Sequence, residues 1–265
     1  MSNLVTRLPV QSRRSNVVIP ITELSPLVNY DPDSTAFWSL YQQVLSSKTG
    51  AYSLTAMDPT NAPPVFTPGK GLIVNGVYQD AYAIHKPTAE RLTDTDLPDG
   101  VTLCAVFLYD PMANPTGNIN RILFGNLQGQ NYGLAITTFN DSPAYSVAQE
   151  KARFPMSTTK LTAGWCFAAL SYNRSTRHLA VLWKQLSSGI SLTDEFTGTD
   201  STPYVPLPTI GYVVGNGSFG EGGSDRKENI TVAEFAVYNK GMGLSDLVAK
   251  YTDARVRMNA VGITV

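Results

Sequence analysis

The chain is poor in charged residues and has no long apolar run. Charged residues make up 15% of its 265 residues, whereas globular proteins usually contain about 25%. The formal net charge of −1 gives no sign of a basic surface for nucleic acid. No segment approaches the roughly 18 consecutive apolar residues that a membrane helix needs. Composition therefore argues against a nucleic-acid partner and against membrane insertion.

A secretion signal and a disulfide framework are also missing. Residues 1–20 include Arg7, Arg13 and Arg14 but no apolar core followed by a small-residue cleavage site, so we expect no signal peptide. The two cysteines, Cys104 and Cys166, both lie in apolar strand patterns. Buried thiols are the simpler interpretation, and a disulfide is the alternative. These features indicate synthesis and folding in a cytoplasm.

Residues 1–68 differ in pattern from the rest of the chain and predict an assembly segment. Residues 1–30 have several prolines and little periodicity, which predicts an extended arm that lies along a neighbouring subunit or folds back on its own domain. Residues 33–50 predict a helix, because their apolar side chains recur at helical spacing. Residues 57–69 are rich in proline and predict a linker. We assign assembly contacts to Arg7, Arg13, Arg14, Phe37, Trp38 and Tyr41.

Residues 69–265 predict an all-β fold, an antiparallel β-sandwich. The segment 101–109 is apolar on both faces, as expected of a central strand. Turn residues separate further short apolar segments at intervals typical of all-β proteins. The predicted strands are 72–74, 81–84, 101–109, 119–124, 132–139, 144–149, 165–172, 179–186, 210–215 and 229–238. A short helix then begins near Leu244, with Leu247, Val248 and Tyr251 on its apolar face.

Several segments, in this order, resemble concanavalin A-like lectin and laminin-G-like domains. Residues 162–173, which contain Gly164-Trp165, are similar to one strand of that family, and residues 176–182 are similar to the next. Residues 210–215 and 230–247 resemble the last strands and the helix start. The resemblance covers roughly residues 70–255 and implies a concanavalin-like jelly roll. An arm without a secretion signal makes the chain similar also to structural proteins of bacteriophage virions.

Catalytic and zinc motifs are missing. The chain has no Glu-x-Asp-x-Glu strand, the pattern that supplies an acid and a nucleophile in some glycosidases of this fold. It has no Gly-x-Ser-x-Gly motif, and we interpret His85 and His178 as surface residues. Two cysteines and two histidines at wide spacing form no zinc pattern. We therefore expect a protein that is not an enzyme and that needs no cofactor.

Calcium is the metal that the resemblance allows, because many laminin-G-like domains hold it with loop carboxylates and carbonyls. The loop residues with suitable oxygens are Asp110, Asn126, Asp141 and Asp225. Solvated turn residues are the simpler interpretation of these four.

Aromatic side chains beside polar ones are the candidates for sugar binding, because such sites combine an apolar surface with a few hydrogen-bonding groups. The loop candidates are Tyr132, Tyr145, Asn216 and Phe219. Strand-end packing is the alternative for each of them. Trp183 lies within a strand and is either a core residue or an exposed stacking surface, whereas we assign Trp165 to the core.

Together these patterns predict a non-enzymatic virion structural protein that displays a lectin-like domain. The arm would anchor it to other virion proteins in a tail or capsid, and the sandwich would bind glycans of the host surface. By analogy we expect a homo-oligomer, a trimer. The first alternative is a structural cement protein of the capsid or tail that binds no sugar. The second is an unrecognised carbohydrate-active hydrolase, which would need two carboxylates about 5–9.5 Å apart.

Overall fold

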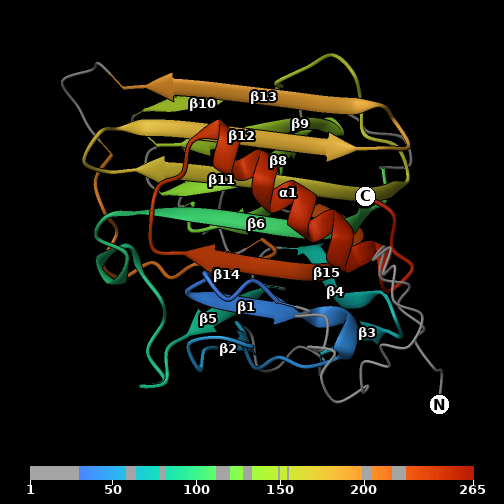
Figure 1. Ribbon diagram of the computed structural model, residues 1–265, viewed down its shortest axis with the longest axis horizontal. Helices are drawn as coiled ribbons and strands as arrows, with labels where there is room; N and C mark the ends of the chain where they lie inside the picture. Colours follow the sequence, from blue (N-terminus) through green and yellow to red (C-terminus); the bar gives the residue numbers. More distant parts are fainter. Residues whose placement is uncertain are drawn as a thin grey trace, which may run out of the picture.

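Two antiparallel sheets stacked face to face form the body of the protein (Figure 1). The computed structural model describes residues 30–57, 64–77, 81–111, 120–127, 133–148, 150–153, 155–198, 204–216 and 225–265. Sheet A has eight strands, with the order β13-β12-β11-β6-β15-β4-β3 and with β1 paired to β15. Sheet B has seven strands in the order β10-β9-β8-β7-β14-β5-β2. The predicted antiparallel β-sandwich is confirmed.

The strands of sheet A are β1 (Ala36–Ser39), β3 (Phe66–Thr67), β4 (Gly71–Val77), β6 (Gly100–Tyr109), β11 (Gly164–Asn173), β12 (His178–Gln185), β13 (Ile190–Thr197) and β15 (Asp225–Tyr238). Those of sheet B are β2 (Ser53–Ala56), β5 (Tyr82–His85), β7 (Asn120–Gly125), β8 (Leu134–Phe139), β9 (Ser142–Val147), β10 (Lys151–Arg153) and β14 (Val213–Val214). Two short 3-10 turns, η2 (Leu40–Gln42) and η3 (Asp94–Asp96), precede the helix α1 (Leu244–Asn259). Among the described residues, no helix has the length and apolar composition of a membrane span.

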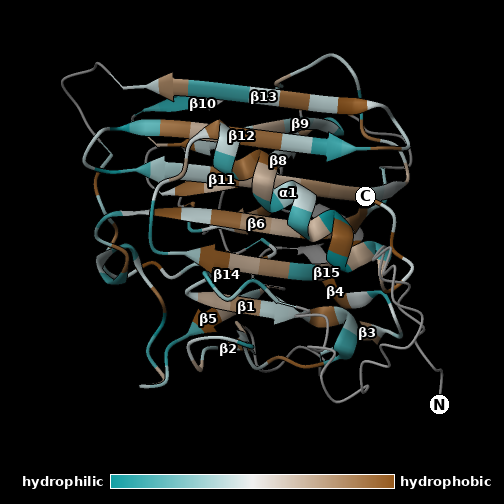
Figure 2. Cartoon of the chain, viewed as in Figure 1, coloured by the Kyte–Doolittle hydropathy of each residue, from teal (hydrophilic) through white to brown (hydrophobic). Residues whose placement is uncertain are grey.

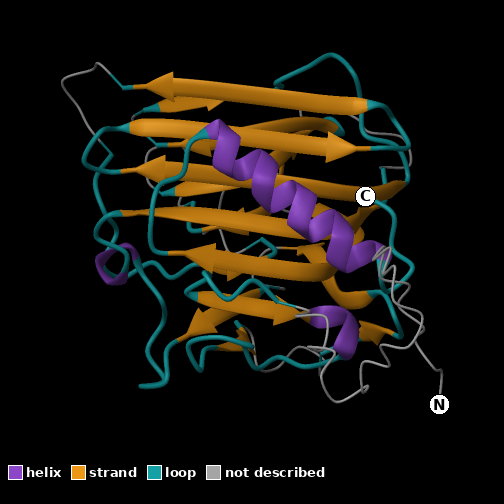
Figure 3. Ribbon diagram, viewed as in Figure 1, coloured by secondary structure: helices purple, strands orange, loops and turns teal. Residues whose placement is uncertain are grey.

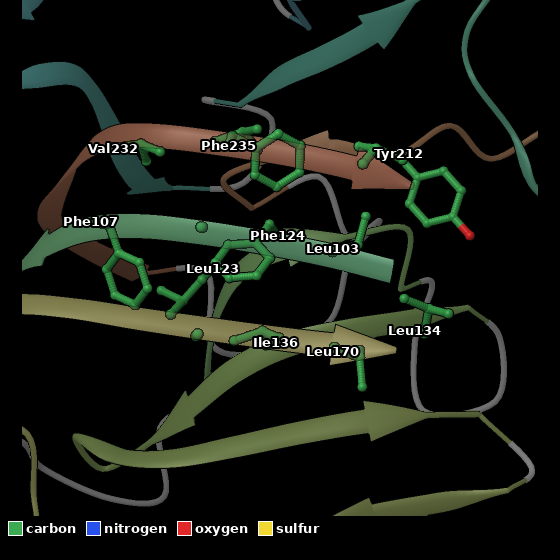
Figure 4. Packing of buried hydrophobic residues seen from close by; sticks show 14 of the residues in the cluster. Leu103, Phe107, Leu123, Phe124, Leu134, Ile136, Leu170, Tyr212, Val232 and Phe235 are labelled. Atoms are coloured by element: carbon green, nitrogen blue, oxygen red, sulfur yellow. The ribbon is translucent and has the colours of Figure 1, made fainter. Parts of the chain in front are cut away.

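The main core lies between the two sheets. The Phe107 ring in β6 meets Phe124 of sheet B and Trp183 of β12 edge to face, each with ring centroids 6.0 Å apart. Figure 4 shows Phe107, Phe124 and Phe235 among the buried side chains of this cluster. Trp183 is fully buried, so its interpretation as a core residue is confirmed and the exposed stacking surface is excluded.

A second apolar cluster lies on the outer face of sheet A, where α1 crosses the strands (Figure 1). Leu247, Ala254 and Met258 are buried there, and the exposed side of the helix is polar for much of its length (Figure 2). The predicted C-terminal helix is confirmed, but Val248 was placed wrongly on its apolar face because it is 42% exposed. Trp165 is half-buried against this outer cluster, so it is not the fully buried core residue that the sequence predicted.

Both thiols are free and buried, as the strand patterns predicted. Cys104 contributes to the outer cluster and Cys166 to the main core. Because burial raises the pKa of both thiols, they remain protonated and unreactive.

The helix predicted for residues 33–50 is wrong. Residues 36–39 form β1, and a 3-10 turn follows (orange, then purple in Figure 3). Phe37 is buried in the outer cluster, whereas its neighbour Trp38 is buried in the main core. Consecutive side chains that reach opposite faces require a strand, because a helix turns adjacent residues by only about 100°. The apolar residues at helical spacing were therefore a coincidence within a β-strand and a loop.

This correction changes the predicted assembly contacts. Phe37 and Trp38 are fully buried and Tyr41 is half-buried within the chain itself, so these side chains stabilise the sandwich. The arginines assigned to the arm, Arg7, Arg13 and Arg14, lie outside the described residues. Strands β1 and β2 pair with β15 and β5, so the sandwich begins before residue 69.

Candidate functional site

The residues predicted to bind a ligand do not form a surface site in the described part of the chain. Tyr145 and Trp183 are fully buried, and Asn216 is 6% exposed. The Tyr145 hydroxyl donates a hydrogen bond to the Asp194 carboxylate at 2.7 Å. Tyr132 and Phe219 lie outside the described residues. Strand-end packing, the alternative considered for the loop residues, accounts for the buried Tyr145.

Two of the calcium candidates, Asn126 and Asp141, are hydrogen-bonded to other groups of the protein. The Asn126 side chain donates to the Asp94 carboxylate at 3.0 Å and accepts from the Leu134 N–H at 2.9 Å. The Asp141 carboxylate accepts a hydrogen bond from the Tyr109 hydroxyl at 2.6 Å. Asp110 follows β6, and Asp225 begins β15. Within the described ranges, no group of three or more histidine, cysteine, aspartate and glutamate side chains is placed to hold a metal ion.

A polar groove opens at the edge of sheet B where β2 ends the sheet. We call it the edge groove; it has a volume of about 390 Å³ and is lined by Ala51, Ser53, Thr55, His85, Lys86, Pro87 and Ala89. One wall is β2, and the other is the turn that follows β5. Ser53 lies directly opposite His85 in the ladder, so their side chains and that of Thr55 point to the same face of the sheet.

The turn after β5 is held by its own backbone. The Lys86 N–H donates to the Glu90 carbonyl at 2.7 Å, and the Ala89 N–H donates to the Lys86 carbonyl at 2.9 Å. Ala89 takes a left-handed conformation with φ 66°, which closes the turn tightly. This local structure fixes His85, Lys86 and Pro87 against β2.

The charged groups of the edge groove are largely compensated. Lys86 Nζ lies 2.8 Å from Asp96 Oδ1 and 3.1 Å from Glu90 Oε2, and the hydrogen bonds that it donates to these carboxylates raise the pKa of Lys86. Burial, and then the nearby Arg91 charge, lower the pKa of His85. The imidazole is therefore neutral near pH 7, and its Nδ1 atom is buried without a hydrogen-bond partner among the described residues.

The hydroxyl groups of Ser53 and Thr55 have no hydrogen-bond partner in the described part of the protein. They can therefore both donate to and accept from a ligand. Neither hydroxyl bonds to His85 within the described ranges. The arrangement suits binding through hydrogen bonds, with Pro87 as an exposed apolar contact.

Sequence reasoning missed this groove. His85 was interpreted as a surface residue, and Ser53 and Thr55 were not considered. The signal available was the alternation of Ser53 and Thr55 with the buried Leu54, which is typical of a strand with one polar face. The pairing of β2 with β5, which creates the groove, is not visible in the sequence.

Two buried carboxylates, Asp94 and Glu150, are not part of the edge-groove lining, and each accepts several hydrogen bonds. The Asp94 carboxylate accepts hydrogen bonds from the Tyr204 hydroxyl, the Tyr212 hydroxyl and Arg174 Nη2 at 2.5–2.6 Å. Glu150 forms a two-point contact with Arg177, at 2.8 Å to Nε and 2.7 Å to Nη2. Burial alone would raise the pKa of Glu150, but the hydrogen bonds from Arg177 and other donors outweigh it and hold that pKa below its ordinary value. Such saturated carboxylates stabilise the fold.

No family model matches the sequence, and no curated protein sequence matches it. Solved structures do match its fold. The binding domain of Paraclostridial Mosquitocidal Protein 1 aligns with a TM-score of 0.55 and 10% identity, over 83% of this chain and 52% of that chain. Botulinum neurotoxin type C, which needs two ganglioside molecules to get into cells, aligns with a TM-score of 0.54 and 9% identity, over 84% and 51%.

A third similar structure is the binding domain of botulinum neurotoxin DC in complex with SialylT, with a TM-score of 0.52, 8% identity, and 84% and 52% of the two chains covered. The chain thus spans about half the length of the toxin structures that it matches. Likeness at such low identity shows the fold alone. The chain shares an antiparallel β-sandwich fold with these toxin structures.

Proposed function

We propose that this chain is a non-enzymatic glycan-binding protein and that the edge groove is its sugar-binding site. The observation that carries the proposal is the pair of hydroxyls of Ser53 and Thr55, which have no hydrogen-bond partner among the described residues and lie beside a neutral His85 on a strand edge. Sugar hydroxyls both donate and accept hydrogen bonds, and so do these groups. Pro87, Ala51 and Ala89 provide apolar contact for the C–H surface of a sugar ring.

The similar structures support a binding role for such a sandwich. Botulinum neurotoxin type C interacts with ganglioside molecules, and the neurotoxin DC domain binds SialylT. A shallow groove of this kind makes few hydrogen bonds, so we expect weak affinity at one site. Several copies acting together would raise the overall affinity by multivalency.

Removal of the two groove hydroxyls tests the proposal. We expect the double variant Ser53→Ala/Thr55→Ala to bind immobilised glycans roughly tenfold more weakly than the parent, because two hydrogen bonds of about 0.5–1.5 kcal/mol each are lost. Binding of the full chain to a glycan array, followed by titration of the best ligand, measures this. Thr193→Ala in β13, an exposed hydroxyl at the opposite edge of the sandwich, is the matched control. Failure of the parent to bind any glycan would refute the proposal.

The carrier that we propose for this domain is a bacteriophage virion, in its tail or capsid. The support is the resemblance in the sequence together with Arg7, Arg13 and Arg14 in a segment that has no acidic residue before Glu23. In this proposal residues 1–30 contact other virion proteins, and the domain is displayed as a homo-oligomer, a trimer. An antibody against the purified protein should label intact virions of a virus that encodes the chain. Virions that carry no label would contradict this part of the proposal.

A further inference from the structure

We propose that the edge groove extends to Arg91 and that Arg91 recognises an anionic substituent, a carboxylate or a sulfate, on the bound sugar. This inference rests on the proposed glycan-binding function and names the class of sugar. Arg91 is not part of the groove lining, and the sequence patterns did not single it out.

Three side chains form a continuous row across the edge of sheet B. Ser53 pairs with His85 between β2 and β5, and His85 pairs with Arg91 in an isolated antiparallel bridge. Residues directly opposite each other in antiparallel strands point to the same face, with Cβ atoms about 4.5–5.5 Å apart. Arg91 therefore stands beside His85 on the side away from Ser53. Burial lowers the pKa of His85, and the nearby Arg91 charge lowers it further.

The aliphatic stem of Arg91 is held in place by a glycine. A Cβ atom on Gly211 would lie 2.8 Å from the Cβ of Arg91 and 3.0 Å from its Cδ. These distances are too short for a side chain at position 211, so the stem lies directly over the Gly211 backbone. The bridge between Thr93 and Gly211 fixes this contact. A stem packed in this way loses less conformational entropy when the guanidinium binds a ligand.

Arg91 supplies the positive charge that the other groove residues do not. Among the described residues Arg91 has no ion pair, whereas Lys86 is bound by Glu90 and Asp96. Asp96 is itself fixed by the Thr93 N–H at 2.8 Å and the Thr93 hydroxyl at 3.0 Å, so Lys86 is not free to turn toward a ligand. His85 is neutral near pH 7 and adds no charge.

A guanidinium in this position matches a planar or tetrahedral anion. Its parallel N–H groups can donate two hydrogen bonds to a carboxylate or a sulfate. The Ser53 and Thr55 hydroxyls would then bind neutral hydroxyls of the same or the next sugar unit. The charged end and the neutral end of the row together define an acidic saccharide as the ligand.

Binding of three matched probes by the full chain tests this inference. The probes are lactose, sialyllactose and sulfated lactose, each immobilised at the same density. We expect the parent to bind at least one acidic probe about tenfold or more tightly than lactose at low ionic strength. Preference between the two acidic probes distinguishes the carboxylate from the sulfate.

Arg91→Met should reduce the ratio of acidic to neutral affinity to about one, and Arg91→Lys should restore part of it. Lys240→Met, at an exposed lysine outside the groove, should leave the ratio as in the parent.

The outcomes separate the inference from the proposed function. Binding of lactose with no preference for either acidic probe would overturn the role of Arg91 and leave the glycan-binding function intact. A preference that survives Arg91→Met would also overturn it. Absence of binding to all three probes and to a glycan array would overturn both.

Discussion

Asp94→Ala should lower the free energy of unfolding by about 3–5 kcal/mol, the loss typical of a buried ion pair that is deprived of one partner. Asp94 is fully buried and binds Arg174 Nη2 at 2.6 Å. Arg174 also donates to the Asp94 and Leu97 backbone carbonyls, so it would remain fixed in place without its carboxylate. The hydroxyls of Tyr204 and Tyr212 would lose their acceptor as well, and each unsatisfied donor adds to the loss.

Urea unfolding followed by tryptophan fluorescence measures this change, because Trp38 and Trp183 are buried in the core. Asp99→Ala is the matched control, since Asp99 lies in the same segment but its side chain is exposed. We expect the control to stay within about 0.5 kcal/mol of the parent. If Asp94→Ala lowered the free energy of unfolding by less than about 1 kcal/mol, the hydrogen bonds of Asp94 with Arg174, Tyr204 and Tyr212 would not be important for stability.

Arg257→Met should be destabilising by about 3–5 kcal/mol at neutral pH, and less so in mild acid. Arg257 in the last turn of α1 makes a two-point contact with Glu234 of β15, at 2.7 Å and 3.0 Å. Both side chains are nearly buried, at 11% and 5% exposure. Without Arg257, Glu234 would remain as an unpaired charge under the helix.

The pH dependence follows from the burial of Glu234. Burial raises the pKa of Glu234 above its ordinary value of 4.5 even with Arg257 present, and removal of Arg257 would raise it further. The folded variant then holds a proton that the unfolded chain has released, so its stability falls as the pH rises from about 4.5 through the folded pKa. Unfolding free energies between about pH 5 and pH 8 measure this slope relative to the parent.

Two further variants support the interpretation of Arg257→Met. Glu234→Gln/Arg257→Met should recover part of the stability, because no charge is left buried. Arg255→Met, on the exposed side of the same helix, should change stability by less than about 0.5 kcal/mol. An equal loss at every pH would show that packing, rather than the buried carboxylate, explains the effect.

The strand-rich body was predictable because β6 is apolar on both faces and further short apolar segments alternate with turn residues along the chain. The layer that each aromatic side chain faces was not predictable. Trp165 and Trp183 both lie in apolar strands, yet Trp165 faces α1 and Trp183 faces sheet B. Which side of a strand faces which layer depends on register and on where the helix packs, and neither is encoded locally.

The edge groove could not be predicted, for a related reason. Ser53, His85 and Arg91 are far apart in sequence or separated by a turn, and pairing of β2 with β5 brings them into one row. Each residue alone looks like an ordinary polar surface residue. The sequence instead predicted a site at aromatic residues near turns, but Tyr145, which the structure describes, is buried in the main core.

The pairing of β1 with β15 determines when the fold can be completed. Ala36 pairs with Val237, and the Tyr238 hydroxyl bonds to Asp31 across 207 positions of the sequence. During synthesis, β1 must therefore wait for nearly the whole chain before its partner exists. Contacts of such long range slow folding and prolong the exposure of unpaired strand edges. Nascent chains that stall before β15 would present Phe37 and Trp38 to chaperones or to one another, and aggregation at that stage would limit the yield of the protein in cells.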